Sequence, residues 1–411
     1  MNALTRSSLA RAAWLLLPVL ATAATASADP WRVVVKGQGA ALGETPVVVE
    51  LKSTIPPGDY TLVPAESGKA RPAHVFRDGG KTFLGIVLDH VAAAPKAEVY
   101  SLQRETKSEL SSAGVELRSS GSNVEVLVGG KPFTTYITDD GPKPYYFPVI
   151  GPTGASFTRA YPMKNVEGED RDHPHQRSMF FTHGKVNGFD FWASDPKNPP
   201  KPNYGSIKET AVKTLAAGQA VGVIHTTDDW LGPDGKKVCE DERVVRFYDT
   251  RAGRVFDFDV VVKATAGPVT FGDTKEGMFG LRVASSMDVK NKKGGKITNA
   301  EGLTDEAAWG KASPWVDYTG PVEGKQVGVA ILNHPSSFRY PTTWHVRTYG
   351  LFAANPFGWH DFGMKQAGDY TIPEGQSIAF RYRVVLHAGP ADVAKLMEAY
   401  ATPPAIEVAS E

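Results

Sequence analysis

The feature that most constrains the fold is an alternation of apolar and polar side chains that recurs along most of the chain. Side chains of a β-strand point to opposite faces in turn, so a strand with one buried face is apolar at every second position. The run 377–387 alternates most clearly, and 254–264 does so too. Because such runs follow one another from residue 115 onward, the sequence predicts an all-β chain built on a large two-sheet sandwich.

Turn and composition signals divide the chain into parts. Residues 29–104 hold short β-branched runs separated by turns such as Pro56-Pro57-Gly58-Asp59, which favours a small immunoglobulin-like β-sandwich domain. A polar stretch at about 105–114 is a predicted linker. Residues 115–400 are expected to form the large β-sandwich domain, closed by a C-terminal amphipathic helix. The tail after Thr402 is expected to be loose.

The segment 1–28 has the pattern of a secretory signal peptide. Arg6 and Arg11 flank the start of an apolar stretch, and Ala26-Ser27-Ala28 offers a small-residue cleavage site. The apolar stretch is shorter than the roughly 20 residues that a spanning helix needs. We therefore expect an exported protein, periplasmic or extracellular, with no membrane span in its mature form. Its single cysteine, Cys239, leaves it without an internal disulfide.

The charge balance bears on the class of partner. The chain has 45 basic and 45 acidic residues and a formal net charge of zero. Proteins that bind nucleic acid through its phosphates carry a clear excess of positive charge. We therefore expect a small molecule or an oligosaccharide as the partner, and no nucleic acid.

Three of the ten histidines lie within the eleven residues 173–183. Read as an extended strand, this segment puts His173, His175, Arg177 and His183 on one face. Imidazoles exchange protons near neutral pH and an arginine can hold an oxyanion, so an acid–base site is one interpretation. Two histidines at His-x-His spacing with a third donor could instead bind a divalent metal. A set of partly buried structural histidines is the third alternative.

Two further blocks place polar groups beside glycine or aromatic residues. Glu276 precedes a glycine at the start of an apolar strand, where a carboxylate can act as a general base. A surface pair with Lys275 is the alternative. Aromatic rings interleaved with polar groups suit stacking on a sugar and binding its hydroxyls, although an aromatic core with turn residues would look similar. The candidate substrate-binding residues are Arg177, Trp192, Arg282, His345, Arg347, Asn355, Trp359 and His360.

Several blocks resemble the bacterial proteins labelled "methane oxygenase PmoA". The resemblance covers about residues 115–395 and is carried by Tyr145-Tyr146-Phe147-Pro148, Asp172-His173-Pro174-His175-Gln176-Arg177, Asn187-Gly188-Phe189-Asp190-Phe191-Trp192, Glu276-Gly277-Met278-Phe279-Gly280 and Gly350-Leu351-Phe352-Ala353-Ala354-Asn355-Pro356. That family is similar, at fold level, to the galactose mutarotase-like β-supersandwich proteins, which include sugar epimerases, polysaccharide lyases and domains of glycoside hydrolases. A membrane methane monooxygenase needs repeated spanning segments, which this sequence lacks, so we do not expect that activity.

These observations lead to one main hypothesis and two alternatives. The main hypothesis is an exported carbohydrate-active protein that performs acid–base chemistry, of epimerase, lyase or hydrolase type, on a sugar in a cleft of the large domain. A histidine of the 173–183 group would be the general acid, Glu276 the base, and Arg177 would steady an oxyanion, with no organic cofactor needed. The alternatives are a non-catalytic glycan-binding protein and a metal-dependent enzyme that uses His173, His175 and His345.

The main hypothesis makes a geometric prediction. The blocks 172–183, 276–282 and 345–360 should converge on a single cleft of the large domain, outside the domain 29–104. His173 and His175 should lie roughly 6–7 Å apart, as same-face neighbours on a strand do. Glu276 should lie within about 15 Å of a histidine of the first block, since a longer separation rules out direct or single-water proton transfer.

Overall fold

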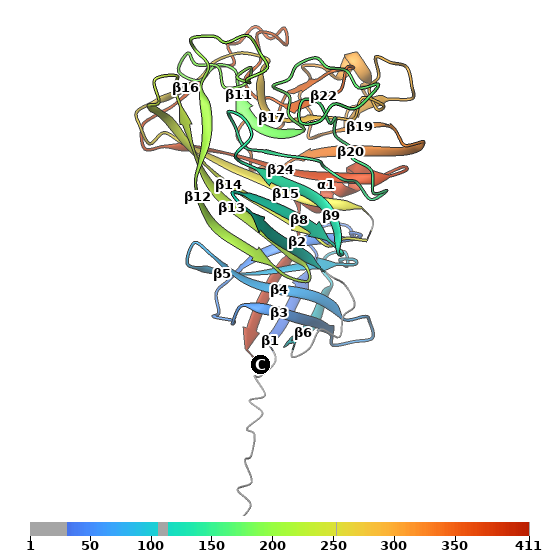
Figure 1. The fold of residues 1–411 in the computed structure, drawn as a ribbon. Coiled ribbons are helices and arrows are strands. Elements are labelled where there is room, and N and C mark those ends of the chain that lie inside the picture. Colours follow the sequence, from blue (N-terminus) through green and yellow to red (C-terminus); the bar gives the residue numbers. More distant parts are fainter. Residues whose placement is uncertain (1–30, 106–113, 252, 411) are drawn as a thin grey trace, which may run out of the picture.

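The computed structural model describes residues 31–105, 114–251 and 253–410. The predicted signal peptide and most of the predicted linker lie outside these residues. Figure 1 shows a small sheet near the C-terminus of the chain and a large sandwich beyond it. The all-β class and the large sandwich preceded by a small β domain are confirmed.

One seven-stranded antiparallel sheet, in the order β2-β5-β4-β3-β6-β1-β25, forms the small domain. Alternating apolar side chains such as Val33, Leu62 and Ile86 enclose a core of its own. The strands are β1 (Trp31–Lys36), β2 (Thr45–Leu51), β3 (Gly58–Pro64), β4 (Arg71–Asp78), β5 (Lys81–Leu88), β6 (Ala97–Arg104) and β25 (Ala405–Ser410).

The C-terminal tail is not loose, as the sequence had suggested, but returns to the small sheet as β25. It pairs with β1 in antiparallel register, with Val408 opposite Val33. Ile406 and Val408 pack against the core of the small domain, which is why this short segment becomes a strand.

Two eight-stranded sheets pack face to face in the large domain. The first has the order β21-β22-β17-β11-β10-β9-β8-β7 and the second the order β12-β13-β14-β15-β24-β20-β19-β18. Side chains from both sheets fill one core between them; Phe279 of the first sheet stacks on Phe258 of the second at 4.6 Å. The two clearest alternating runs of the sequence become β24 and β15, neighbours in the second sheet.

The strands of the first sheet are β7 (Val115–Ser120), β8 (Asn123–Val128), β9 (Lys131–Ile137), β10 (Tyr145–Tyr146), β11 (Met179–His183), β17 (Gly277–Arg282), β21 (Trp344–Val346) and β22 (Leu351–Ala354). Those of the second are β12 (Ser206–Ala217), β13 (Val221–Leu231), β14 (Lys237–Tyr248), β15 (Arg254–Lys263), β18 (Lys296–Asn299), β19 (Trp315–Val322), β20 (Lys325–Asn333) and β24 (Ser377–Ala388). The pair β16 (Val269–Phe271) and β23 (Tyr370–Ile372) and a short 3₁₀ turn, η1 (Asp305–Ala308), complete the domain.

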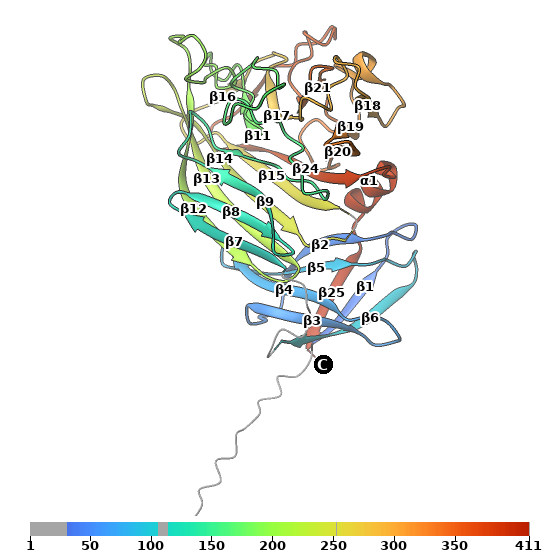
Figure 2. The same cartoon turned by 45° about the vertical axis from the view of Figure 1, so that its right-hand side comes forward.

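The predicted C-terminal helix is α1 (Val393–Ala401), which lies between the large sandwich and the small sheet (Figure 2). The Asp392 side chain accepts a hydrogen bond from the Lys395 amide and caps its first turn. Its buried stripe packs in a cluster that also contains Phe76 of the small domain and Tyr248 of the large one. Within the described ranges, no helix has the length and apolar character needed to cross a bilayer.

A histidine also ties the two domains together. His225 of β13 contacts Asp78 of the small domain through Nδ1 (2.6 Å) and Glu242 of β14 through Nε2 (2.7 Å). All three side chains are at least partly shielded from solvent. The junction is therefore apolar at α1 and ionic at His225.

The first sheet has an outer face that points away from the sandwich core. Phe180 and Leu351 lie on this face and form a small apolar cluster separate from the main core. Their chain neighbours Phe181 and Phe352 point into the main core, as strand alternation requires. The candidate site described next lies at this outer face.

Candidate functional site

The segment before β11 is a loop and not the strand that the sequence suggested. β11 begins only at Met179, and the residues before it form a turn closed by a hydrogen bond from the Gln176 amide to the His173 carbonyl (3.0 Å). His173 has a left-handed φ of 45°, which is incompatible with an extended strand. The common strand face predicted for the three histidines and Arg177 is therefore wrong.

The turn nevertheless keeps His173 and His175 side by side. Their ring centroids are 5.7 Å apart and the rings meet edge to face. His175 Nδ1 lies 3.0 Å from Asn198 Nδ2, and its ring faces that of the buried Trp192 at 6.3 Å. Burial lowers the pKa of His175 to about 3, so this imidazole is neutral at neutral pH.

Asp172 fixes the orientation of His173. Its Oδ2 lies 2.9 Å from His173 Nδ1, while its Oδ1 accepts hydrogen bonds from Arg159 (2.5 Å) and Arg282 (2.9 Å). Burial alone would raise the pKa of the Asp172 carboxyl, but the His173 hydrogen bond and the two guanidinium charges lower it well below its usual range. The ionised carboxylate holds a proton on Nδ1 and leaves Nε2 of His173 as the reactive nitrogen, on a side chain that is 41% exposed.

Tyr349 stacks on the other side of this pair. Its ring lies parallel to the His173 imidazole, within 5° and at 5.1 Å between centroids. Arg282 lies over the same tyrosine ring at 4.7 Å and donates to Gln176 Oε1 at 2.5 Å. The buried guanidinium of Arg282 therefore contacts Asp172, Gln176 and Tyr349 and holds these three side chains together.

Glu276 lies next to the end of β11. Its carbonyl accepts a hydrogen bond from the Gly184 amide (2.7 Å), so Glu276 is close to the neighbouring His183 and the predicted proximity to a histidine is confirmed. Its side chain is 34% exposed, with Lys275 Nζ at 3.6 Å. Burial raises the pKa of Glu276, and the charges of Lys275 and His173 only partly offset this.

His183 itself faces the sandwich core. It is fully buried, its ring packs against Phe271 and Phe357, and its Nε2 contacts the Gly272 carbonyl at 2.8 Å. Burial lowers the pKa of His183 to about 4. The prediction that His183 exchanges protons with a substrate is therefore wrong: it belongs to the core side of β11.

Arg177 is also a structural residue. Its side chain is buried and makes ion pairs with Asp195 (2.6 Å) and Asp140 (2.9 Å). It lies over the ring of Tyr145 at 5.4 Å, under the loop that carries the histidines. All its charge is used within the protein, so the predicted contact with a substrate oxyanion is wrong.

The third block extends the site. His345 of β21 is buried, and its Nδ1 receives a hydrogen bond from Trp309 Nε1 (3.2 Å). Burial lowers the pKa of His345 to about 3. The half-buried Arg347 lies over both Trp309 (5.3 Å) and Tyr349 (5.7 Å), which forms a layer of rings and cations beside His173.

The remaining predicted residues position the site or lie at its margin. Asn355 is fully buried and donates to the Thr274 carbonyl (2.9 Å), which holds the loop before Glu276. Trp359 is covered by Arg339 at 4.2 Å. His360 is exposed, and its amide donates to Asp273 (3.1 Å).

The three blocks therefore lie together, although with different members, and the single cleft expected there stays a prediction. Sequence reasoning missed Asp172, Gln176, Tyr349 and Trp309. Asp172 could have been found from its place beside His173, whereas Trp309 comes from a segment with no local signal. In the described parts of the chain, no three His, Cys, Asp or Glu side chains are arranged to hold a metal ion, so the predicted set of His173, His175 and His345 finds no support.

Comparisons with known proteins give a family and two distant structures. A model described as "Family of unknown function (DUF6807)" matches residues 123–401, and no curated protein matches the chain. A glycosyl hydrolase family 38 protein from Enterococcus faecalis has 11% identity and a TM-score of 0.41, over 92% of this chain and 47% of that one. An α-mannosidase from Enterococcus faecalis V583 has 12% identity and a TM-score of 0.40, over 93% and 46%. The chain thus spans about half the length of either.

Proposed function

The chain belongs to the DUF6807 family of unknown function, and we propose from its own residues that it is a carbohydrate-active protein that performs acid–base chemistry on a sugar. The observation that carries this proposal is the Asp172–His173 pair, with Nδ1 held at 2.9 Å by an ionised carboxylate and the rest of the imidazole exposed. An aspartate that fixes one nitrogen of a histidine prepares the other nitrogen for proton transfer.

The geometry supports roles opposite to those expected from the sequence. His173 Nε2 accepts a proton from a sugar carbon or hydroxyl, and Asp172 stabilises the imidazolium that forms. Glu276, whose pKa is raised by burial, supplies a proton to the oxygen on the other side of the reacting bond. In an elimination, the C–H bond breaks as the N–H bond forms at His173, a C=C bond forms as the neighbouring C–O bond breaks, and the departing oxygen takes the proton of Glu276. In a hydrolysis, His173 instead takes its proton from the attacking water, and in an epimerisation a proton returns to the same carbon from the opposite face.

The residues around the pair suit a sugar ring. The partly exposed rings of Tyr349 and Trp309 add aromatic surface beside the pair, and Arg347 and Lys275 offer donors for hydroxyl oxygens. We also propose export to the periplasm or the medium, on the sequence pattern of residues 1–28.

Turnover on a glycan panel, with products identified by mass spectrometry and NMR, tests the proposal. His173→Gln and Glu276→Gln should each lower kcat on the active glycan by about 10²–10⁴-fold, the usual contribution of a general acid or base. Glu50→Gln, a change at an exposed glutamate of the small domain, is the matched control and should leave kcat unchanged. Full turnover by both variants would sink the proposal.

A non-catalytic glycan-binding protein is the second candidate, favoured by the layer formed by Trp309, Arg347 and Tyr349. Such a layer binds a sugar without changing it. Calorimetry combined with product analysis separates the two: binding with an unaltered glycan after long incubation supports this candidate.

A further inference from the structure

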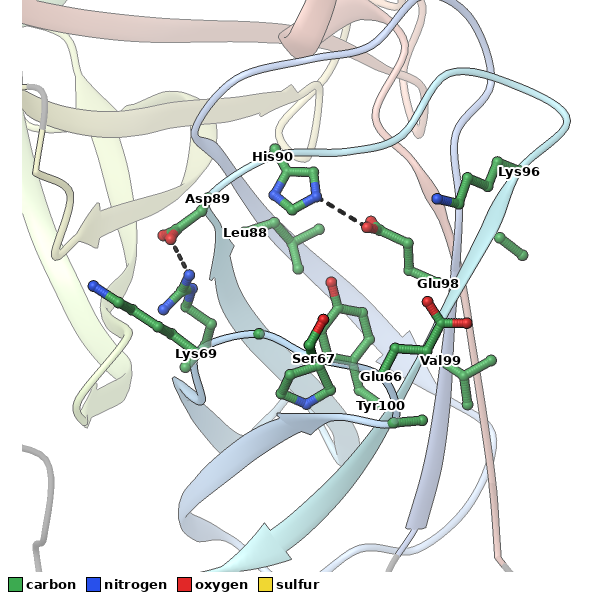
Figure 3. A pocket seen from close by; sticks show the side chains of 15 residues that line it. Glu66, Ser67, Lys69, Leu88, Asp89, His90, Lys96, Glu98, Val99 and Tyr100 are labelled. Carbon is green, nitrogen blue, oxygen red and sulfur yellow. Dashed lines mark hydrogen bonds and ion pairs between the residues drawn. The ribbon is translucent and has the colours of Figure 1, made fainter.

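The small domain contains a cavity far from the site described above. It has a volume of about 510 Å³ and lies between the β3–β4 connection at 65–70, the segment 88–90 after β5, and the start of β6 at 96–100 (Figure 3). Small-molecule sites span roughly 300–1,000 Å³, so this cavity can hold a ligand of one or two sugar units. In Figures 1 and 2 these strands lie at the opposite end of the molecule from β11 and β17.

The cavity is lined by an equal number of acidic and basic side chains. They are Glu66, Asp89, Glu98, Lys69, Arg71 and Lys96. A cavity meant for an anion or a cation would carry an excess of the opposite charge. Alternating acceptors and donors instead match a neutral ligand with many hydroxyl groups, because each hydroxyl both donates and accepts a hydrogen bond.

Two of the carboxylates are already held in place. Asp89 is paired with Arg71 and with Arg251 (3.1 Å) of the large domain. His90 Nε2 holds Glu98 Oε1 at 3.0 Å, an interaction visible in Figure 3. A ligand would therefore meet groups that need little further ordering, which lowers the entropic cost of binding.

Glu98 and Tyr100 add two polar groups to the lining. Glu98 Oε2 is buried and, within the described residues, makes no hydrogen bond of good geometry. Burial raises the pKa of Tyr100, and its contact with the charged Glu98 side chain raises it further, so the phenol keeps its proton. Leu88 and Val99 supply apolar surface for the C–H groups of a sugar.

We propose that this cavity binds a neutral saccharide of one or two units, so that the small domain is a second carbohydrate-binding site. It shares its ligand class with the proposed function but needs no chemistry in the large domain. Binding at this end would hold the protein on a glycan while the His173 site remains open.

Calorimetry with the full chain tests this inference. The probes are glucose, galactose, mannose, xylose, maltose and cellobiose, with glycine and inorganic phosphate as the zwitterion and the anion. The measurements use the His173→Gln/Glu276→Gln double variant beside the unaltered protein. We expect at least one neutral saccharide to bind both equally, and Glu98→Gln to weaken that binding by about tenfold or more, as loss of a charged hydrogen-bond acceptor does.

Two further variants keep the test decisive. Ser67→Trp lies on the exposed β3–β4 connection and should block the cavity without disturbing the core, so it should abolish saccharide binding. If Glu98→Gln does not fold, the result for Ser67→Trp tests the inference in its place. Glu50→Gln, on an exposed strand outside the cavity, should have no effect. The inference is overturned if no saccharide binds the double variant, if the cavity variants keep full affinity, or if glycine or phosphate binds in preference. Saccharide binding that only the double variant loses would overturn this inference while leaving the proposed function intact.

Discussion

Asp172 is the residue on which the geometry of the candidate site depends most. Its carboxylate faces the His173 imidazole on one side and the guanidinium groups of Arg159 and Arg282 on the other. Both arginines are almost fully buried, so their charges rely on this partner. A side chain that is 36% exposed thus pairs with two buried cations and orients His173, the proposed proton-transfer group.

Asp172→Asn is expected to lower the free energy of unfolding by about 2–3 kcal/mol. The change leaves two buried guanidinium charges uncompensated, and the partial exposure of Asp172 keeps the loss below that of a fully buried pair. Urea denaturation measures it. Arg171→Gln, at the exposed neighbouring position, is the control and should change the free energy by less than about 0.5 kcal/mol; an equal effect of the two changes would contradict the role given to Asp172.

The variant His183→Phe is expected to lower the stability of the protein without lowering its activity. The phenyl ring keeps the packing against Phe271 and Phe357 but leaves the buried Gly272 carbonyl without its partner, which costs about 1–3 kcal/mol. Thermal or urea unfolding should show this loss, while kcat on the active glycan stays within about twofold. A fall in kcat comparable to that of His173→Gln would show that His183 takes part in the reaction.

At the scale of elements, β25 closes the small sheet at its β1 edge. Removing residues 405–411 would leave the β1 edge unpaired and would expose core that Ile406 and Val408 cover. The shortened chain should show faster amide hydrogen exchange at Val33–Val35 and a tendency to aggregate. Glu407→Gln, which breaks only an exposed pair with Lys36, is the control; unchanged protection of β1 in the shortened chain would argue against a structural role for β25.

Whether the sequence predicts a feature depends on whether the residues that determine the feature lie within one segment of the chain. The alternation that identifies β15 and β24 lies within the strands themselves, so it survives any tertiary context. The conformation of 172–178 does not follow from such a pattern, because Arg159 and Arg282 reach it from distant segments. The sequence did not predict β25, because Ile406 and Val408 pack against the core only when the segment pairs with β1.

At the scale of the whole molecule, the ionic junction makes stability depend on acid. Burial would raise the pKa values of both Asp78 and Glu242. Hydrogen bonds to His225 and Thr214 lower the pKa of Asp78, and hydrogen bonds to Lys263, Lys213 and then His225 lower that of Glu242 to about 2. Carboxyls with pKa values below those of the unfolded chain stabilise the fold above about pH 4.5, and this contribution is lost as the pH falls toward 2.

His225→Asn is therefore expected to lower stability at neutral pH and to make its loss on acidification shallower. Urea midpoints at about pH 7, 5, 4 and 3 measure this, because the variant loses a hydrogen-bond partner of Asp78, while Lys263 and Lys213 still hold Glu242 ionised. His360→Asn removes an exposed histidine and should follow the unaltered protein at every pH. Parallel curves for His225→Asn and the unaltered protein would show that the junction does not titrate as described.

The pairing of β1 with β25 has a consequence for synthesis. The whole large sandwich is inserted between two neighbouring strands of one sheet, so vectorial synthesis delivers the first of them long before the second. The large sandwich can fold as its strands emerge, but the small sheet is complete only after β25 has been synthesised and has left the ribosome. Its closure is entropically cheap despite the long intervening segment, because that cost grows only with the logarithm of loop length.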